Sequence, residues 1–444
     1  MTDYIATDTE LTSVANAIRT KGGTNAQLSF PTEFVSAINA ISTGSVPENS
    51  VTFIDYDGTI LYSYTRSEFA NLSSMPPNPD RTSKGLVAQG WNWSLADAKD
   101  QMTITNGLVI GQMYTTVDGK THFKISFSED SVSTTRTVTL YLTQSDANVA
   151  TIDWGDGSAV ETDSTSGANT FSKQHVYNEG GDYDITVSVA AGGSVRFGYA
   201  GDNSSSNMFG LTTALTTLRN YAIVKEINIG NGINGLGNYS FANFEQLDRI
   251  SIPNTTTNFD YSGSLTRCYS LQGLVIPSGA TVIGGYFTNG CYGLKYVSIP
   301  KGVTTIKTYA LSYHYNMARI ELPSTVNTCG SYSLAYSYKL KNIYIPDLTQ
   351  IGASTFTHCH GIETVTIPNT VTGIYGYAFQ YCYRLKSIHM ESTAPPGLSG
   401  SSWFDNNDGL VIYVPRSTNQ TVLNAYKTAT NWSNYSSRMQ EEPE

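Results

Sequence analysis

Two kinds of short stretch in this chain hold residues that could do chemistry. One kind is acidic: carboxylates follow an apolar run in FIDYDGTIL and recur about a hundred residues later. These residues are Asp55, Asp57, Asp156, Glu161 and Asp163. Carboxylate oxygens are the ligands that Mg²⁺ prefers. The other kind is the triplet His358-Cys359-His360, whose imidazole and thiol groups are transition-metal ligands. Either pattern predicts a site only if the surrounding elements bring its side chains together.

FIDYDGTIL resembles the first motif of haloacid-dehalogenase-type phosphatases, which implies Asp55 as nucleophile and Asp57 as general acid. Such an enzyme needs a buried parallel strand before the nucleophile and a succession of strands and crossover helices after it. The chain instead continues with PPNPDRTSKG, one short helix (SLADAKDQM) and alternating strands. VTFIDY and ILYSYT alternate apolar and polar residues around Asp57-Gly58, and glycine supplies the positive φ of a hairpin turn. We therefore predict a β-hairpin, no catalytic residues and no enzyme.

Length and composition predict several β-rich modules. With 444 residues the chain exceeds one ordinary domain, so we expect two to four modules. Only 14% of residues are charged, whereas Gly (39) and Tyr (30) are abundant, which suits strands, turns and binding surfaces. A net charge of -10 without a Lys/Arg run argues against a nucleic-acid partner. The sequence shows no secretory signal and no apolar run of about 18 residues, so we expect no membrane partner.

A repeat of 22 to 24 residues determines the architecture of the second half. Ile-Pro or Leu-Pro recurs at Pro253, Pro277, Pro300, Pro323, Pro346 and Pro368. Apolar residues recur six and three positions before each proline, in the pattern L-x-x-I-x-I-P. This pattern is typical of a short strand with its apolar side chains turned inward. Because one unit cannot bury its apolar face alone, the units must stack into a solenoid.

Units such as LKYVSIPKGVTTIKTYALSYHYN resemble BspA-type leucine-rich repeats, and the resemblance covers roughly residues 211–430. It implies that the C-terminal tail closes the solenoid as a cap, with Val422, Tyr426 and Trp432 over the last coil.

The His358-Cys359-His360 triplet falls within this repeat. Alternation on an extended segment turns Cys359 one way and both histidines the other. The Cys359 position recurs once per coil as Cys268, Cys291, His314, Ser337, Cys359 and Cys382. We therefore predict an inward ladder of buried thiols rather than a metal site, and we expect no metal and no cofactor. Oxidation would allow Cys268–Cys291 or Cys359–Cys382 crosslinks.

Residues 134–190 resemble a PKD-type β-sandwich. The match is carried by TIDWGDGS (151–158), HVY (175–177) and GDYDITV (181–187). The resemblance implies that Trp154 packs in the core, that Gly-Asp-Gly makes a hairpin turn, and that the domain is a rigid spacer. Asp156 then has a role in a turn, which argues against a Mg²⁺ site there.

The first 45 residues predict two short helices whose narrow apolar stripes need a partner or other copies of the chain. This opening and the block from VTFIDYDGTILYSYT to GLVIGQMYTTVDGKTHFKI are similar to the front end of tail-associated proteins in phages and prophages of Gram-positive gut bacteria. The expected fold is mainly β and modular. Its expected parts are 1–45, a helical attachment or oligomerisation segment; 50–130, a β-rich module; 131–197, a PKD-like sandwich; 205–395, leucine-rich repeats; and 396–444, the last repeat and cap.

Two surfaces of the solenoid are candidates for binding. The first is the concave strand face, where the side chains between the inward residues vary. Its residues are Arg249, Ser251, Tyr296, Ser298, Arg319, Glu321, Asn342, Tyr344, Ser387 and His389. The second is formed by aromatic files beside the cysteine ladder, which either bind a partner or only stack along the solenoid. Its residues are Tyr313, Tyr315, Tyr336, Tyr338, Tyr381 and Tyr383. We favour the strand face.

These observations predict a phage tail fibre or receptor-binding protein that recognises a host surface glycan or protein without catalysis. Its N-terminus would bind other tail or baseplate proteins, and the chain would form a homo-oligomer, for example a trimer. It would be made in the host cytoplasm and would act in the virion tail, exposed to the medium. The alternatives are a bacterial cell-surface adhesin with the same repeats and, second, a tail-associated hydrolase.

Overall fold

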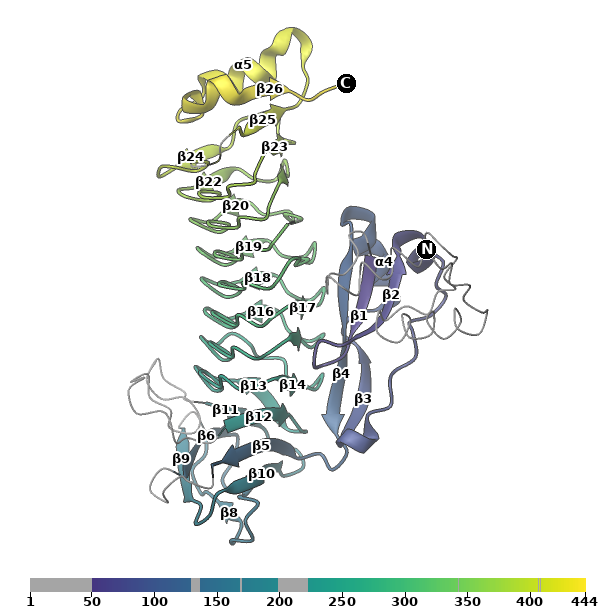
Figure 1. Ribbon diagram of the computed structural model, residues 1–444, viewed down its shortest axis with the longest axis vertical. Helices are drawn as coiled ribbons and strands as arrows, with labels where there is room; N and C mark the ends of the chain where they lie inside the picture. The colour runs from purple at the N-terminus through teal and green to yellow at the C-terminus, as the bar shows by residue number, and fades with distance from the viewer. Residues whose placement is uncertain are drawn as a thin grey trace, which may run out of the picture.

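The computed structural model describes residues 50–128, 136–167, 170–198, 223–341, 343–405, 407 and 409–444. The chain forms a front module (residues 50–119), a β-sandwich at the base and a solenoid that rises from the sandwich to a helical cap (Figure 1). The predicted fold class, mainly β with few helices and a solenoid, is confirmed. The predicted helical segment 1–45 lies outside the described residues.

The front module is a four-stranded sheet with the order β2-β1-β4-β3. Its strands are β1 (Ser50–Ile54), β2 (Ile60–Thr65), β3 (Leu86–Trp91) and β4 (Leu108–Thr116), and its helices are α3 (Arg66–Ala70), the 3-10 helix η1 (Thr82–Lys84) and α4 (Leu95–Ile104). β1 and β2 pair antiparallel, and Gly58 in their turn has φ +84°, so the predicted hairpin is confirmed.

The two faces of this sheet are both apolar. On one face, Phe69 of α3 and Met102 of α4 pack against Phe53 and Trp91. The other face carries Ile54, Val109 and Met113, which pack against residues of the solenoid. The front module therefore needs the solenoid to bury its second face.

Two sheets form the base sandwich, with the orders β14-β12-β5-β10-β7-β8 and β13-β11-β6-β9. The strands are β5 (Thr121–Phe127), β6 (Thr137–Gln144), β7 (Ala150–Asp153), β8 (Glu161–Thr162), β9 (Phe171–Val176), β10 (Gly181–Val189), β11 (Val195–Phe197), β12 (Ile223–Asn228), β13 (Ile233–Leu236) and β14 (Arg249–Ser251). Trp154 is fully buried, as predicted. Gly155 and Gly157 have φ +77° and +82° between β7 and β8, as the predicted turn requires. That the sandwich is of the PKD type stays a prediction.

Strand pairing crosses the expected boundaries between parts. β5 belongs to the expected 50–130 module but pairs with β10. β12 belongs to the expected repeat region but pairs with β5 on one side and with β14 on the other. Phe123 and Phe197 of the sandwich contact Phe241 of the first coil. One continuous core therefore runs from the sandwich into the solenoid.

The solenoid stacks short parallel strands, one coil apart. One side carries β15 (Gly273–Val275), β17 (Tyr296–Ser298), β21 (Thr364–Ile367), β23 (Ser387–Met390) and β25 (Val411–Val414). Another carries β16 (Val282–Ile283), β18 (Thr305–Ile306), β19 (Thr328–Cys329), β20 (Gln350–Ile351), β22 (Gly373–Tyr375) and β24 (Gly397–Ser399). The register pairs Leu274 with Val297 and Val365 with Ile388, which are equivalent inward positions. These residues and the four cysteine thiols of the predicted ladder are buried, as predicted, and the thiol of Cys329 is buried as well.

The cap comprises η5 (Thr418–Gln420), α5 (Thr421–Thr428), η6 (Trp432–Arg438) and β26 (Met439–Glu441), which pairs with β25. Tyr426 and Trp432 are fully buried against the last coil, and Val422 packs beside them, so the predicted cap is confirmed. None of the helices in the part of the chain that the structure describes is long and apolar enough to cross a membrane.

Candidate binding site on the strand face of the solenoid

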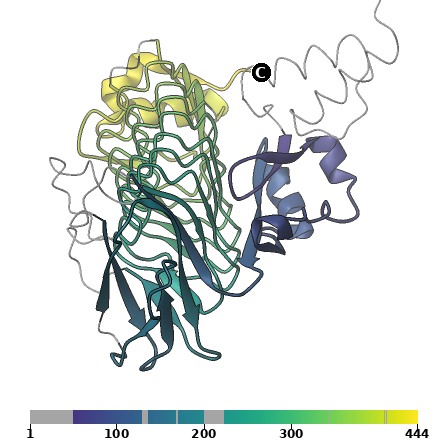
Figure 2. The same ribbon diagram turned by 60° about the horizontal axis from the view of Figure 1, so that its bottom comes forward.

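The side chains two and four residues before each repeat proline form a surface that we call the strand face. The front module packs against the first part of this face, since β4 lies against β14, β15 and β17 (Figure 1, Figure 2). The fit is close. A Cβ added to Gly111 would lie 2.4 Å from Cγ2 of Val275, and one added to Gly273 would lie 2.3 Å from Cα of Gly58. At these places only glycine allows the two parts to approach.

A buried asparagine hydrogen-bonds across this interface. The Asn92 Nδ2 donates to the carbonyl oxygens of Ile276 (2.8 Å) and Ser298 (3.3 Å). The Asn92 Oδ1 accepts from the backbone N–H of Gly111 (2.9 Å) and lies 3.0 Å from the Ser298 hydroxyl, whose single proton it shares with the Val109 carbonyl oxygen. Because the amide N–H groups and the amide oxygen all have partners away from water, the docked position is specific.

Further contacts lie along the edge of the docked module. The indole N–H of Trp93 donates to the carbonyl oxygen of Ile299 (3.0 Å), with the ring buried. Lys301 of the solenoid forms ion pairs with Asp97 (2.9 Å) and Asp100 (3.0 Å) of α4. These ion pairs are partly exposed, so they orient the module more than they stabilise it.

Docking covers several of the predicted binding residues. Ser251 and Ser298 are fully buried, and the Ser298 hydroxyl donates to the carbonyl oxygen of Val109 (2.7 Å). Tyr296 packs against the apolar cluster of β1 and β4. A partner cannot contact Ser298 while the module is docked.

The two predicted arginines also contact the protein's own chain. Arg249 forms an ion pair with Glu226 (2.8 Å) on the neighbouring strand. Arg319 donates to the backbone carbonyl of Ser50 (2.8 Å) at the start of β1 and forms an ion pair with Glu321. Arg319 and Glu321 therefore mark the border between the covered and the open part of the strand face.

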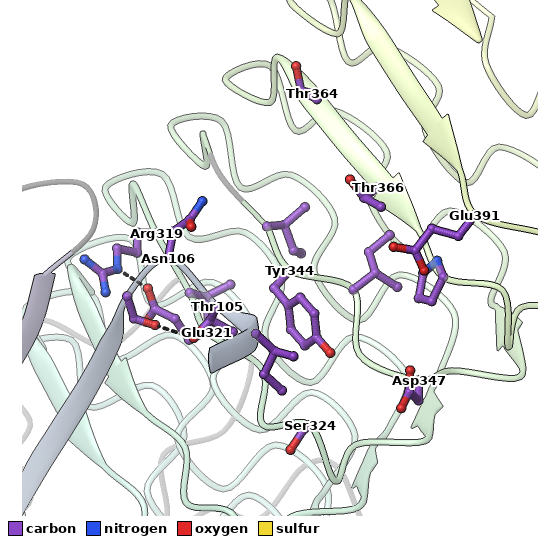
Figure 3. A pocket seen from close by; sticks show the side chains of 16 residues that line it. Thr105, Asn106, Arg319, Glu321, Ser324, Tyr344, Asp347, Thr364, Thr366 and Glu391 are labelled. Atoms are coloured by element: carbon purple, nitrogen blue, oxygen red, sulfur yellow. Dashed lines mark hydrogen bonds and ion pairs between the residues drawn. The ribbon is translucent and has the colours of Figure 1, made fainter. Parts of the chain in front are cut away.

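Beyond this border, a groove of about 610 Å³ opens between residues 104–107 of the front module and the strand face of successive coils (Figure 3). The size is within the range of roughly 300–1,000 Å³ that is usual for ligand sites. Its strand-face residues are Arg319, Glu321, Tyr344, Thr364 and Thr366. Both threonines are exposed and Tyr344 is half-buried. We call this groove the coil groove.

The charges of the coil groove are mainly negative. Its charged lining consists of three carboxylates, Glu321, Asp347 and Glu391, and one guanidinium, that of Arg319. The Glu321 Oε2 is shielded from solvent and has no hydrogen-bond partner among the described residues. Burial raises the pKa of the Tyr344 hydroxyl, and the negative charges of Asp347 and Glu391 raise it further. The groove therefore disfavours anions.

The repeats match a known family. Residues 213–318 and 261–386 match the BspA type Leucine rich repeat region, in six copies. Residues 213–386 of the solenoid therefore consist of BspA-type leucine-rich repeats. No curated protein matches the chain.

Several solved leucine-rich-repeat structures are similar to about half of this chain at low identity. A leucine-rich repeat protein from Bacteroides ovatus is 15% identical over 51% of this chain and 68% of its own, with a TM-score of 0.29. A leucine rich cell surface protein from Faecalibacterium prausnitzii is 17% identical over 54% of this chain and 94% of its own, with a TM-score of 0.21. The Leucine Rich Repeat protein of T. pallidum is 16% identical over 52% of this chain and 88% of its own, with a TM-score of 0.33.

Two predicted residues of the solenoid, Ser387 and His389, lie on β23 nearer the cap. The His389 ring stacks on Tyr413 with centroids 4.9 Å apart. Its Nδ1 lies 2.8 Å from Glu442, and its Nε2 lies 3.1 Å from the Ser387 hydroxyl. Both side chains therefore help to attach the C-terminus. The predicted residue Asn342 lies outside the described residues.

The sequence-based selection missed part of the coil groove. Thr364 and Thr366 stand four and two residues before Pro368, the same positions as the selected residues, and could have been found by extending that register. Asp347 and Glu391 follow the strands of their coils. Residues 104–107 belong to another module, and no repeat pattern could place them beside the groove.

The predicted aromatic files of the BspA-type repeats form continuous ladders of stacked rings. Tyr292, Tyr315 and Tyr338 stack with centroids 4.5 and 4.7 Å apart and planes within 5°. Tyr313 and Tyr336 stack at 4.3 Å, and the following His358 and Tyr381 continue that ladder. Because neighbouring rings cover each other's faces, mainly edges and hydroxyls remain for a partner. The terminal Tyr383 is the most exposed of these tyrosines, at 55%.

Stacking also explains why tyrosine is found at strained backbone positions. Tyr313, Tyr336 and Tyr381 have φ +60°, +61° and +59°, the left-handed region that costs a non-glycine residue about 1–2 kcal/mol. A stacked aromatic pair contributes about 0.5–1.5 kcal/mol. The two effects are of similar size, so each ladder offsets the strain of its own turns. This supports the structural interpretation of the files that the sequence left open.

The acidic motif is held within the front module by local contacts. Asp55 is 1% exposed and forms an ion pair with Arg81 at 2.7 Å. Asp57 accepts a hydrogen bond from the backbone N–H of Thr59 (2.9 Å), as in an Asx turn. These contacts use both carboxylates to stabilise the hairpin and its neighbouring loop.

The histidines of the His-Cys-His triplet belong to the aromatic ladders. His358 stacks between Tyr336 and Tyr381, and His360 stacks on Tyr338 (4.7 Å). Burial lowers the pKa of both rings, and His360 lowers that of His358 further. Within the described ranges, no group of three His, Cys, Asp or Glu residues could hold a metal ion.

Proposed function

We propose that this protein is a non-catalytic adhesion protein that recognises a cell surface through the coil groove. The observation that carries the proposal is the groove itself, in which exposed and half-buried polar side chains from successive coils face a loop of the front module. Four successive coils and a second module contribute to one lining, which is the arrangement expected of a selective site. The BspA-type repeats support a role in recognition.

The binding of labelled full-length protein to a panel of intact gut bacteria tests this proposal. Thr366 is exposed inside the groove, so a Thr366→Arg variant fills the site without disturbing the core. We expect at least about a tenfold loss of cell binding, measured by flow cytometry. Thr328→Arg is the matched control, since Thr328 is an exposed strand threonine on another side of the solenoid. Equal binding by the two variants would refute the proposal.

The location of the protein is a further part of the proposal. The BspA-type repeats support a bacterial cell-surface adhesin. The placement in a phage tail, with the N-terminus bound to tail proteins and the chain forming an oligomer, rests on the resemblance of the N-terminal region. Antibodies against the solenoid, applied to intact cells and to purified phage particles of the source bacterium, distinguish the two. Label on particles alone would place the protein in the virion.

A further inference from the structure

The lining of the coil groove combines apolar and acidic side chains. Ile343, Ile345 and Pro368 belong to this lining, as does Ile104 of the front module, which is 48% exposed. The Tyr344 hydroxyl points toward the side of the groove where Asp347 and Glu391 lie (Figure 3). A ligand that fills the groove therefore contacts both apolar surface and negative charge.

The two acidic residues at that side are available to a ligand. Asp347 and Glu391 are both exposed, and neither forms an ion pair within the part of the chain that the structure describes. A second observation points the same way: Glu321, 9% exposed, also lines the groove and keeps one carboxylate oxygen without a partner among the described residues. The lining thus carries more negative charge than Arg319 can neutralise.

The chemistry that matches this lining is a positive charge at the end of an aliphatic chain. Lysine and arginine side chains bury their methylene groups against apolar surface while keeping the charged group at a polar edge. The face of Tyr344 can add a cation–π contact. A sugar amine sits directly on a hydroxyl-rich ring, so it would bring hydroxyl groups against the isoleucine side chains of the lining, where burial without a hydrogen bond is unfavourable.

We propose that the coil groove binds the cationic side chain of a lysine or arginine carried on a peptide of the recognised surface. The inference rests on the proposed function, because it names the ligand of the same groove. An anionic or purely apolar ligand would leave Asp347 and Glu391 without a counter-charge.

Biolayer interferometry of the full-length protein on immobilised peptides tests the proposal. The probes are acetylated Ala-Ala-X-Ala-Ala peptides in which X is lysine, arginine, norleucine or Nε-acetyl-lysine. We expect binding to lysine and arginine that is at least about fivefold stronger than binding to the uncharged pair. Asp347→Asn and Glu391→Gln should each weaken binding about threefold, and the double variant about tenfold.

A matched control is Glu363→Gln, which makes the same charge change nearby but outside the groove, where Glu363 pairs with Arg384 and Lys386. It should leave peptide binding unchanged. Equal binding to lysine and norleucine peptides, or full binding by the double variant, would overturn the proposal. Binding to immobilised glucosamine oligomers without binding to the lysine peptide would overturn the proposal as well, because the recognised amine would then belong to a glycan and not to a peptide.

The two proposals fail in different ways. If Thr366→Arg abolishes cell binding but no cationic peptide binds, the groove recognises the surface and only the ligand class is wrong. If Thr366→Arg leaves cell binding intact, the site itself is wrong.

Discussion

The covered and open parts of the strand face use the same repeat positions in opposite ways. Under the front module these positions hold residues that contact the module, among them the buried Ser251, Gly273 and Ser298 and the partly buried Tyr296. In the open part they hold larger or exposed residues such as Tyr344 and Thr366. The inward residues are alike in both parts, since the core requires them. The strand face is therefore free to dock a domain in one part and to form a groove in the other.

The two parts depend on each other. Docking buries the second apolar face of the front module, made by Ile54, Val109 and Met113, against Val275 and Tyr296. It also brings residues 104–107 to the edge of the coil groove, where they form part of the lining. If the module moved away, the strand face would be exposed and the groove would lose one wall.

The largest effect is expected where the two backbones touch. In Gly273→Ala the new Cβ would lie 2.3 Å from Cα of Gly58, and no flexible side chain can move to relieve the overlap. We expect the free energy of docking to become less favourable by about 3 kcal/mol or more. The front module should then separate from the strand face while the chain keeps it attached to the sandwich. Small-angle X-ray scattering should show a larger radius of gyration, and the fluorescence of Trp93 should shift to the red as its ring becomes exposed.

The control for this variant is Gly373→Ala, also on a short strand of the solenoid, where the nearest atoms lie 3.8 Å from the added Cβ. That protein should scatter like the original one. An unchanged radius of gyration for Gly273→Ala would mean that the covered part is not covered in solution.

A smaller but still large effect is expected for Asn92→Ala. The change leaves the carbonyl oxygen of Ile276 and the N–H of Gly111 without the buried amide that they contact. We expect the free energy of unfolding of the docked module to fall by about 2–3 kcal/mol. Urea denaturation followed by tryptophan fluorescence measures this. A loss under about 0.5 kcal/mol would show that water replaces the amide at the interface.

A matched pair of variants sharpens the comparison directly. Ser298 and Thr366 both stand two residues before a repeat proline, one covered and one open. Ser298→Ala removes the donor to the Val109 carbonyl and should lower the free energy of unfolding by about 1–2 kcal/mol. Thr366→Ala should change the free energy of unfolding by no more than about 0.5 kcal/mol, because the Thr366 side chain is exposed. If both variants lost the same free energy of unfolding in urea denaturation, the covered and open parts would not differ in how they use this position.

Much of the fold could be predicted from the sequence because it is local or periodic. The proline spacing places the inward residues Leu274 and Val297 opposite each other, and the structure pairs them. The Asp57-Gly58 turn follows from the need for positive φ, and Gly58 has it. Each of these depends on neighbours in the chain or on the adjacent coil.

The candidate site could be predicted only in part, because it depends on contacts between distant parts of the chain. Tyr344 lies in the coil groove as its repeat position suggested, whereas Ser298 has the same position and is buried by Val109, almost two hundred residues earlier. A repeat pattern specifies which way a side chain points and does not specify what lies above it. The contact requires glycine at positions 111 and 273, but this reason for the two glycines can be recognised only once the contact is known.

The smallest effect is expected at the rim of the covered part, where Lys301 pairs with Asp97 and Asp100. Lys301→Met should weaken docking by less than about 1 kcal/mol, and the difference should shrink in high salt. The Ser94 hydroxyl and then Lys301 lower the pKa of Asp97 below its usual 3.8. A lowered carboxyl pKa stabilises the docked state above pH 3.8, and this stabilisation is lost as the pH falls through the lowered pKa.

Urea denaturation of the original protein and Lys301→Met between pH 3 and 7 measures this contribution. The difference between the two should be constant from about pH 5 to 7 and should decrease below about pH 4, as Asp97 takes up a proton. Lys307→Met is the control, because Lys307 pairs with Asp260 within the solenoid and has no role in docking. If both variants showed the same salt and pH dependence, the rim ion pairs would contribute nothing specific to docking, and the covered part would be held by its buried contacts alone.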